Sequence, residues 1–153
     1  MSRLEDMEMM VKQLESLMEG ERHVIPNLAN ASALIMQTME NLNWAGFYLM
    51  EEGSLLLGPF QGKTACIRIP VGRGVCGTAV KENRTLRVED VHQFPGHIAC
   101  DCASNSEIVV PIRVMGNVVG VLDIDSPMVG RFSEMEQELL EKFVEILEVG
   151  CDW

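Results

Sequence analysis

The sequence predicts a single α+β domain, in which an antiparallel sheet of about six strands carries helices on one face and a long loop covers a pocket. Two observations support this. Apolar residues recur at helical spacing before residue 43 and after residue 133, whereas from Trp44 the pattern changes to short strand-like segments followed by turns. A chain of 153 residues fits one domain spanning 1–153, with no room for a second core.

Two helices are expected within residues 2–43. Ser2 and Glu5 form a capping-box pattern that opens the first helix, and its apolar stripe runs up to Gly20. The second apolar stripe follows Pro26 and ends near Asn43. Both stripes are rich in methionine, which we interpret as core filling.

Two further helices are expected later in the chain. Ser133 and Glu136 repeat the capping-box pattern and open a C-terminal helix over 133–148. A short helix is expected over 74–81, directly after a pair of glycines.

The remaining patterned segments, within 44–126, read as strands followed by short turns. Residues 90–105 show no period and are expected to form a loop, and loops of more than about 12 residues in small domains are usually functional. A pocket is therefore expected beneath this loop. The predicted strands cover 44–50, 54–60, 66–69, 85–88, 106–114 and 118–125.

Composition narrows the class of partner. The formal net charge of -11 repels phosphate backbones and anionic membranes, so nucleic acid and membrane surfaces are unfavourable partners. No apolar run approaches the roughly 18 residues that a bilayer span requires. Charged residues near the N-terminus interrupt any signal-peptide pattern, so we expect a cytoplasmic protein.

Five cysteines are many for a cytoplasmic chain, and their odd number argues against a fully paired disulfide framework. Some are therefore expected to be reactive. Cys76 lies among glycines in the first turn of a predicted helix, where the helix dipole favours a thiolate. A zinc site is the competing interpretation, which the absence of a C-x-x-C spacing disfavours; its ligands would come from Cys66, Cys76, Cys100, Cys102 and His97.

Three carboxylates fall at the ends of two predicted central strands. Asp123 and Asp125 are two residues apart, so they project from one face in line with apolar positions, which favours a pocket over solvent. Glu107 joins that face only in one register. A two-residue turn at Gly116-Asn117 places it opposite Ser126, whereas a three-residue loop or one bulge places it opposite Asp125.

Aromatic residues and histidines complete the set of candidate residues. Trp44 and Tyr48 share one strand face, which suggests either core packing or an aromatic wall of a pocket. His92 and His97 flank the Pro95-Gly96 turn and are expected to shape the loop rather than to act in catalysis.

Five segments together resemble one known family. They read GPFQGKTAC at 58–66, GRGVCG at 72–77, FPGHIACD at 94–101, SNSEIVVP at 104–111 and GVLDIDS at 120–126. The chain is similar in these segments to the free methionine-(R)-sulfoxide reductases, which have a GAF-type fold. The likeness extends from Trp44 to the last helix and includes three cysteines at the family's spacing.

The resemblance implies a thiol-dependent enzyme that reduces free L-methionine-(R)-sulfoxide to L-methionine. It implies that Cys100 attacks the sulfoxide, Cys66 resolves the sulfenic acid as a disulfide, and Cys76 assists, although the helix dipole alone would rank Cys76 first. It also implies a substrate site in which carboxylates hold the ammonium group and protonate the sulfoxide oxygen beside an aromatic wall. These residues are Glu107, Asp123, Asp125, Trp44 and Tyr48.

The resemblance further implies that thioredoxin recycles the disulfide and that no metal or organic cofactor takes part. A homodimer is compatible with the methionine-rich amphipathic helices, and the resemblance also implies it, because members of the family are often dimeric. Cys102 and Cys151 fall outside the three-cysteine pattern. The alternative function is a non-catalytic GAF module that senses a small molecule, because the fold alone does not separate the two.

Overall fold

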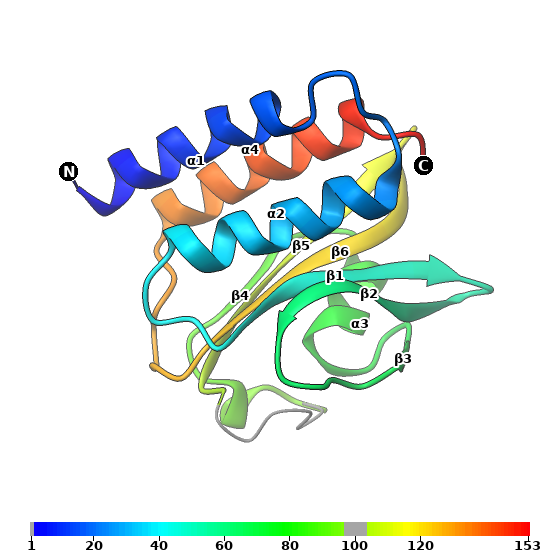
Figure 1. Cartoon of the computed structure of the whole chain (residues 1–153). Coiled ribbons are helices and arrows are strands. Elements are labelled where there is room, and N and C mark those ends of the chain that lie inside the picture. The colour runs from blue at the N-terminus through cyan, green and yellow to red at the C-terminus, as the bar shows by residue number, and fades with distance from the viewer. Residues whose placement is uncertain (1, 97–103) are drawn as a thin grey trace.

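The chain folds into a sheet lined by helices on one side and by loops and a short helix on the other (Figure 1). The computed structural model describes residues 2–96 and 104–153. Within them, four α-helices and one 3₁₀ turn accompany six strands of a single sheet. The α+β class expected from the sequence is therefore confirmed.

The two N-terminal helices begin and end at residues whose local chemistry explains them. Helix α1 (Arg3–Leu17) opens with the predicted capping box between Ser2 and Glu5. Helix α2 (Val24–Thr38) starts two residues before Pro26 instead of after it, because Pro26 lies in the first turn, where its missing N–H costs no helical hydrogen bond. It also ends earlier, since Met39 is already extended.

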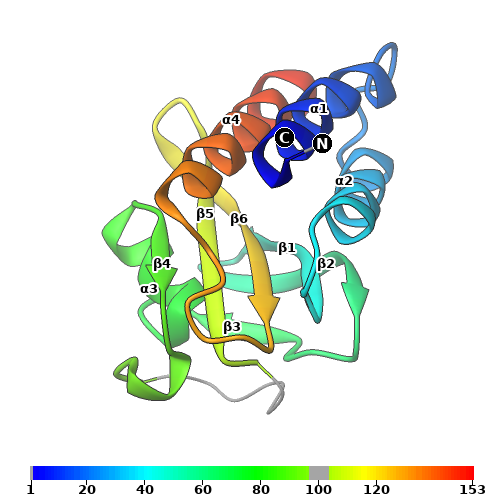
Figure 2. The ribbon, with the colours of Figure 1, turned by 90° about the vertical axis from the view of Figure 1, so that its left-hand side faces the viewer.

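Helix α4 (Glu134–Gly150) closes the fold and completes a layer of three helices (Figure 2). Its capping box between Ser133 and Glu136 matches the sequence pattern. Helix α1 packs on α2 and α4, while α2 contacts β1 and β2 and α4 contacts β5. These three helices cover one face of the sheet, as expected.

The six strands lie in the order β3-β2-β1-β6-β5-β4, and every neighbouring pair is antiparallel. The strands β1, β6 and β5 form the centre of the sheet. The long loop includes a 3₁₀ turn, η1 (Val91–Gln93). The strands are β1 (Trp44–Glu51), β2 (Ser54–Gly62), β3 (Arg68–Pro70), β4 (Leu86–Val88), β5 (Ser106–Val114) and β6 (Asn117–Ser126).

Alternation along the central strands separates two buried clusters. Phe47, Leu122 and Ile124 face the helix layer and belong to the larger core. Trp44 and Val121 face the opposite side and belong to a second, smaller cluster. The period of two that predicted these strands thus also assigns each residue to a face.

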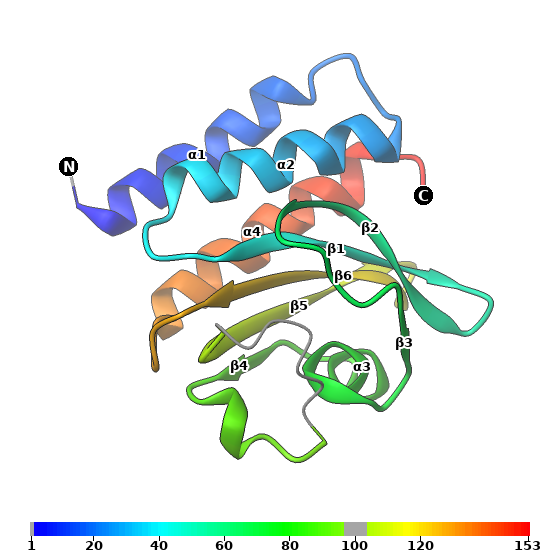
Figure 3. The same ribbon diagram turned by 60° about the horizontal axis from the view of Figure 1, so that its bottom comes forward.

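Helix α3 (Gly74–Glu82) lies on the opposite face from the other three (Figure 3). Its buried residues Val75, Cys76 and Ala79 pack in the second cluster with Val109. Gly77 permits this position, since a Cβ there would lie 2.4 Å from the carbonyl oxygen of Pro70. The expectation that helices pack on one face holds for α1, α2 and α4, and α3 instead forms a wall on the other face.

The β5–β6 hairpin adopts the register that brings the carboxylates together. Its turn is Met115-Gly116, both with positive φ, because Val114 pairs with Asn117. A bulge then shifts the pairing between Ile112 and Arg113 by one residue. Glu107 consequently lies opposite Asp125, which confirms the bulged alternative and excludes the turn at Gly116-Asn117.

None of the helices in the described part of the chain combines the length and apolarity needed to cross a membrane.

Candidate active site

A pocket opens on the face of the sheet that carries α3. Its floor consists of the ends of β1, β5 and β6, and its walls consist of α3 and the segment before β3. The pocket is lined by Trp44, Tyr48, Thr64, Ala65, Ile69, Arg73, Gly74, Val75, Cys76, Ser104, Glu107, Asp123 and Asp125. Seven of the eight residues expected at the site therefore lie around this pocket or, as with Cys66, directly beside its lining.

The three predicted carboxylates converge on the pocket floor. Glu107 pairs with Asp125 across the β5–β6 ladder, and Asp123 lies two residues away on the same face. Glu107 is 7% exposed and Asp123 is 5% exposed, whereas Asp125 is half-buried. Burial of this much acidic surface is costly without compensation, which points to a ligand that supplies it.

Mutual contact and burial alter the protonation of this group. Burial raises the pKa of Glu107 well above its usual range, and the neighbouring charges of Asp123 and Asp125 raise it further. Burial also raises the pKa of Asp123, although hydrogen bonds from Glu107 and Cys76 oppose that shift. Of these two carboxyls, Glu107 is therefore the one whose protonated form is favoured more strongly, and its side chain is hydrogen-bonded to Asp123.

In the part of the chain that the structure describes, the two buried carboxyls lack a balancing cation. Among the described residues, no lysine, arginine or histidine forms an ion pair with Glu107 or Asp123. One oxygen of Asp123, Oδ1, is buried and has no hydrogen-bond partner in that part of the chain. The floor of the pocket is thus prepared to accept hydrogen bonds and positive charge.

Cys76 lies in the pocket as a buried free thiol. Its Sγ is 3.9 Å from Oε2 of Glu107. Burial raises the pKa of Cys76 well above its usual range, and the negative charges of Asp123 and Glu107 raise it further. Burial and two neighbouring carboxylates therefore outweigh the helix dipole at the start of α3, which taken alone would favour a thiolate.

The aromatic wall predicted at Trp44 and Tyr48 is present. The two rings stack at 5.9 Å between centroids, and both side chains line the pocket. Trp44 Nε1 donates to the carbonyl of Lys63, and the Tyr48 hydroxyl donates to the carbonyl of Cys66. Both side chains therefore also position the segment that carries Cys66.

Cys66 is disulfide-bonded and half-buried beside the pocket, whereas Cys76 and Cys151 are free. Cys151 is buried at the end of α4 in the other core cluster, on the opposite side of the sheet from the pocket. Cys100, Cys102 and His97 lie outside the described residues.

The described ends of the covering loop are held close to β6. Val91 N–H donates to the carbonyl of Asn105, and Asn105 N–H donates to the carbonyl of Ser126. His92 Nε2 lies 3.0 Å from Oδ1 of Asn105. His92 thus has the loop-shaping position expected for it, outside the pocket lining.

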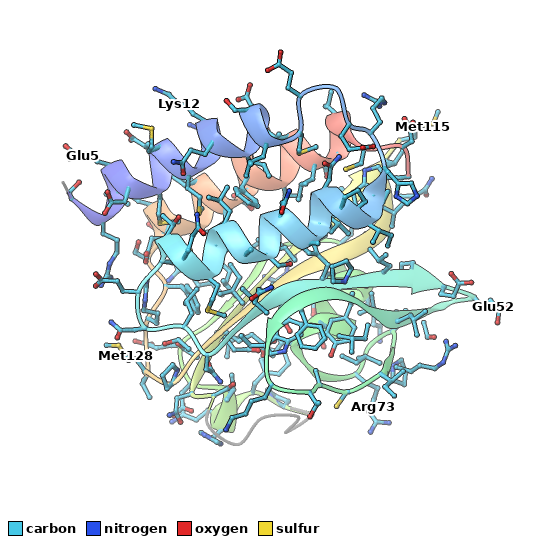
Figure 4. All side chains as sticks on the ribbon, in the orientation of Figure 1. Glu5, Lys12, Glu52, Arg73, Met115 and Met128 are labelled. Carbon is cyan, nitrogen blue, oxygen red and sulfur yellow. The ribbon has the colours of Figure 1, made fainter. Side chains whose placement is uncertain are left out.

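Sequence reasoning missed several residues at the site. Arg73 lies at the pocket rim, directly before α3, and Figure 4 labels it on the side of the sheet away from α1. Ser104 lines the pocket and accepts a hydrogen bond from Nδ2 of Asn43. Phe60 stacks on Trp44 at 5.1 Å, which the absence of a side chain at Gly46 permits. Of these residues, only Arg73 could have been identified from the sequence as a candidate, because it lies between two glycines directly before a predicted helix.

Comparison with known proteins places this arrangement in a family. The GAF domain model matches residues 7–150. Protein YtsP of Bacillus subtilis (strain 168) is 57% identical over 94% of this chain and 89% of its own length. The free methionine-R-sulfoxide reductase of Escherichia coli (strain K12) is 56% identical over 90% of this chain and 83% of its own length. The chain belongs to the free methionine-R-sulfoxide reductase family of GAF domains.

A solved member of this family has the same fold. The free methionine-R-sulfoxide reductase from Neisseria meningitidis in complex with its substrate is 40% identical, with a TM-score of 0.95 over 98% of this chain and 90% of that one. The resemblance inferred from the five sequence segments is thereby confirmed.

Proposed function

We propose that this chain reduces free L-methionine-(R)-sulfoxide to L-methionine in the pocket described above. The observation that carries this function is the pair of buried carboxyls, Glu107 and Asp123, that no cationic side chain of the described residues balances. An amino-acid ammonium group supplies that charge. Membership of the family and the reaction named for its close relatives support the same substrate.

The pocket offers a partner for each part of the substrate. Asp123 and Asp125 accept hydrogen bonds from the ammonium group, and Trp44 and Tyr48 contact the methyl group on sulfur. The carboxylate lies toward Arg73 and the start of α3, where no side chain of the described residues caps the helix. Glu107 carries a proton and donates it to the sulfoxide oxygen.

The thiol chemistry needs two cysteines and releases one water. Cys100 attacks the sulfoxide sulfur as a thiolate, the oxygen passes to the cysteine as a sulfenic acid, and methionine leaves. The Cys66 thiol then attacks the sulfenic sulfur, water departs, and a Cys66–Cys100 disulfide forms. The disulfide-bonded state of Cys66 supports the resolving role, and the free, protonated Cys76 supports an auxiliary one.

A dithiol protein of the thioredoxin class returns the disulfide to two thiols in a reducing compartment, which accords with a cytoplasmic enzyme. No metal or organic cofactor enters this cycle, since the thiols carry both electrons. A homodimer formed through the N-terminal helices remains part of this proposal.

Substrate selectivity tests the function directly. The free R-sulfoxide, its N-acetyl derivative and a short peptide containing it should be compared in single turnovers at matched concentrations. Loss of the ammonium charge leaves the buried carboxylates uncompensated, so we expect the last two to react at least about 100-fold more slowly. Comparable rates would refute recognition of the amino group, and absence of turnover with binding retained would favour the sensing module.

The nucleophile is tested by Cys100→Ser, with Cys151→Ser as the matched control. We expect the first to abolish reduction and the second to preserve it, because Cys151 lies in the other core cluster, across the sheet from the pocket. Retained single-turnover activity in Cys100→Ser, together with its loss in Cys76→Ser, would transfer the nucleophilic role to Cys76.

A further inference from the structure

Three potential metal ligands from three different elements meet at the base of the pocket. They are Cys76 of α3, Glu107 of β5 and Asp123 of β6, and one donor atom from each lies within 4.8 Å of the other two. All three side chains are buried. In a tetrahedral zinc site with bonds of about 2.0–2.3 Å, neighbouring ligand atoms are roughly 3.3–3.8 Å apart. Small rotations of these three side chains would therefore bring their donor atoms to the spacing that zinc requires.

An independent observation points to a ligand at the same place. Oδ1 of Asp123 is buried without a hydrogen-bond partner among the described residues, in a side chain that lines the pocket and is 5% exposed. A buried carboxylate oxygen left in this way is costly. A bound cation would remove that cost.

The donor set selects the kind of cation. One thiol and two carboxylates are a mixed soft and hard set, which suits zinc, whereas magnesium and calcium prefer oxygen ligands alone. Three protein ligands would leave the fourth tetrahedral position to a water molecule.

We propose that Cys76, Glu107 and Asp123 bind one zinc ion at the base of the pocket, in competition with the substrate. Binding is not a redox step: the Cys76 thiol and the Glu107 carboxyl release their protons to solvent, a zinc–sulfur bond forms, and the two carboxylates donate oxygen lone pairs. The competition rests on the proposed function, because the same carboxylates hold the substrate ammonium. The zinc site itself does not depend on it. This ligand set is different from the one considered from the sequence, since it shares only Cys76 with that set.

Binding is measured without turnover, on the full chain with Cys66 disulfide-bonded. Zinc affinity is obtained by competition with a chromogenic chelator, and cadmium serves as a spectroscopic probe, because a cadmium–thiolate bond absorbs in the ultraviolet. We expect one equivalent to bind. Cys76→Ser should remove the cadmium band and weaken zinc binding by at least about 10-fold, whereas Cys151→Ser, which alters a free thiol in the other core cluster, should bind as wild type does.

Glu107→Gln provides a second test if Cys76→Ser does not fold, and it should weaken zinc binding while retaining the cadmium–thiolate band. Equal zinc affinity in wild type, Cys76→Ser and Glu107→Gln would overturn the site. Methionine added as a competitor should raise the apparent dissociation constant of zinc. Zinc binding that methionine does not alter would keep the metal site and refute the overlap with substrate, so the two failures are distinguishable.

Discussion

Two regions of this molecule bury acidic side chains, and they differ in what lies beside them. At the start of α4, Glu136 is paired with Arg131 at 2.7 Å, and the two side chains are 2% and 1% exposed. At the base of the pocket, Glu107 and Asp123 are buried to a similar degree, but no cationic side chain of the described residues pairs with them.

This difference indicates that the buried charge at Glu136 has a structural role, whereas the buried carboxyls of the pocket have a functional one. Arg131 also donates to the carbonyl of Glu40, so this pair ties the loop before β1 to the start of α4. Its charges are compensated within the protein. The pocket carboxyls have no such partner within residues 2–96 and 104–153, so a proton or a ligand relieves their charge, and their protonation is sensitive to conditions.

The largest expected effect on stability comes from breaking the compensated pair. Glu136→Gln keeps the capping-box geometry, since glutamine serves in that motif, but it leaves the buried Arg131 charge without its partner. We expect the free energy of unfolding to fall by about 3–5 kcal/mol, with turnover of the folded protein unchanged. Urea denaturation and single-turnover assays measure both quantities.

The matched control is Glu134→Gln, in the same first turn. Its carboxylate is 86% exposed and lies 4.0 Å from Arg87, so its removal should leave stability nearly unchanged. Equal stability of the two variants would show that Arg131 and Glu136 contribute no more than a surface pair.

The second prediction is that a substitution at the pocket lowers activity but not stability. Glu107→Gln removes the proposed proton donor, and we expect kcat/KM for the free R-sulfoxide to fall by roughly 100-fold or more. Because no ion pair within the described residues is broken, the free energy of unfolding should not decrease at neutral pH. Glu51→Gln, an exposed position on β1, is the control. Wild-type kinetics in Glu107→Gln would remove this residue from the mechanism.

The third prediction concerns pH. The pKa of Glu107 is raised in the folded protein above its usual value of 4.5, so folding takes up a proton between that value and the higher folded pKa. The resulting stabilisation is fully present below the unfolded pKa and is lost as pH rises through the folded pKa. Melting curves from pH 5 to pH 8 should therefore show a decline for wild type that Glu107→Gln lacks. Parallel curves would mean that Glu107 is ionised in both states.

Much of the fold could be predicted because its signals are local. The apolar run over 118–125 predicted a strand, and the two-residue spacing of Asp123 and Asp125 placed both on one face of it. Two capping boxes predicted the helix starts at Ser2 and Ser133. The start of α2 was misplaced because Pro26 is allowed inside a first turn as well as before a helix.

The site was less predictable, because it depends on pairings between distant segments. A single bulge near Arg113 decides whether Glu107 faces the other carboxylates, and the sequence left both registers open. The helix dipole alone is a poor guide to the thiol of Cys76 for the same reason. Its helix position was visible in the sequence, but the contact with Glu107 on another element was not.

The smallest expected effect tests the turn that sets this register. Met115 and Gly116 both have positive φ, and Met115 is 95% exposed, so its side chain contributes little packing. Asparagine tolerates this backbone conformation better, and Asn-Gly is the favoured pair for such a turn. We expect Met115→Asn to raise the free energy of unfolding by about 0.5–1 kcal/mol, as substitutions that relieve turn strain do.

Activity should not change, because the pairing of Glu107 with Asp125 lies at the other end of the hairpin. Urea denaturation measures the first quantity and single-turnover assays the second. A loss of activity without a loss of stability would show that the register at the pocket depends on this turn rather than on the bulge and the two buried faces of the strands.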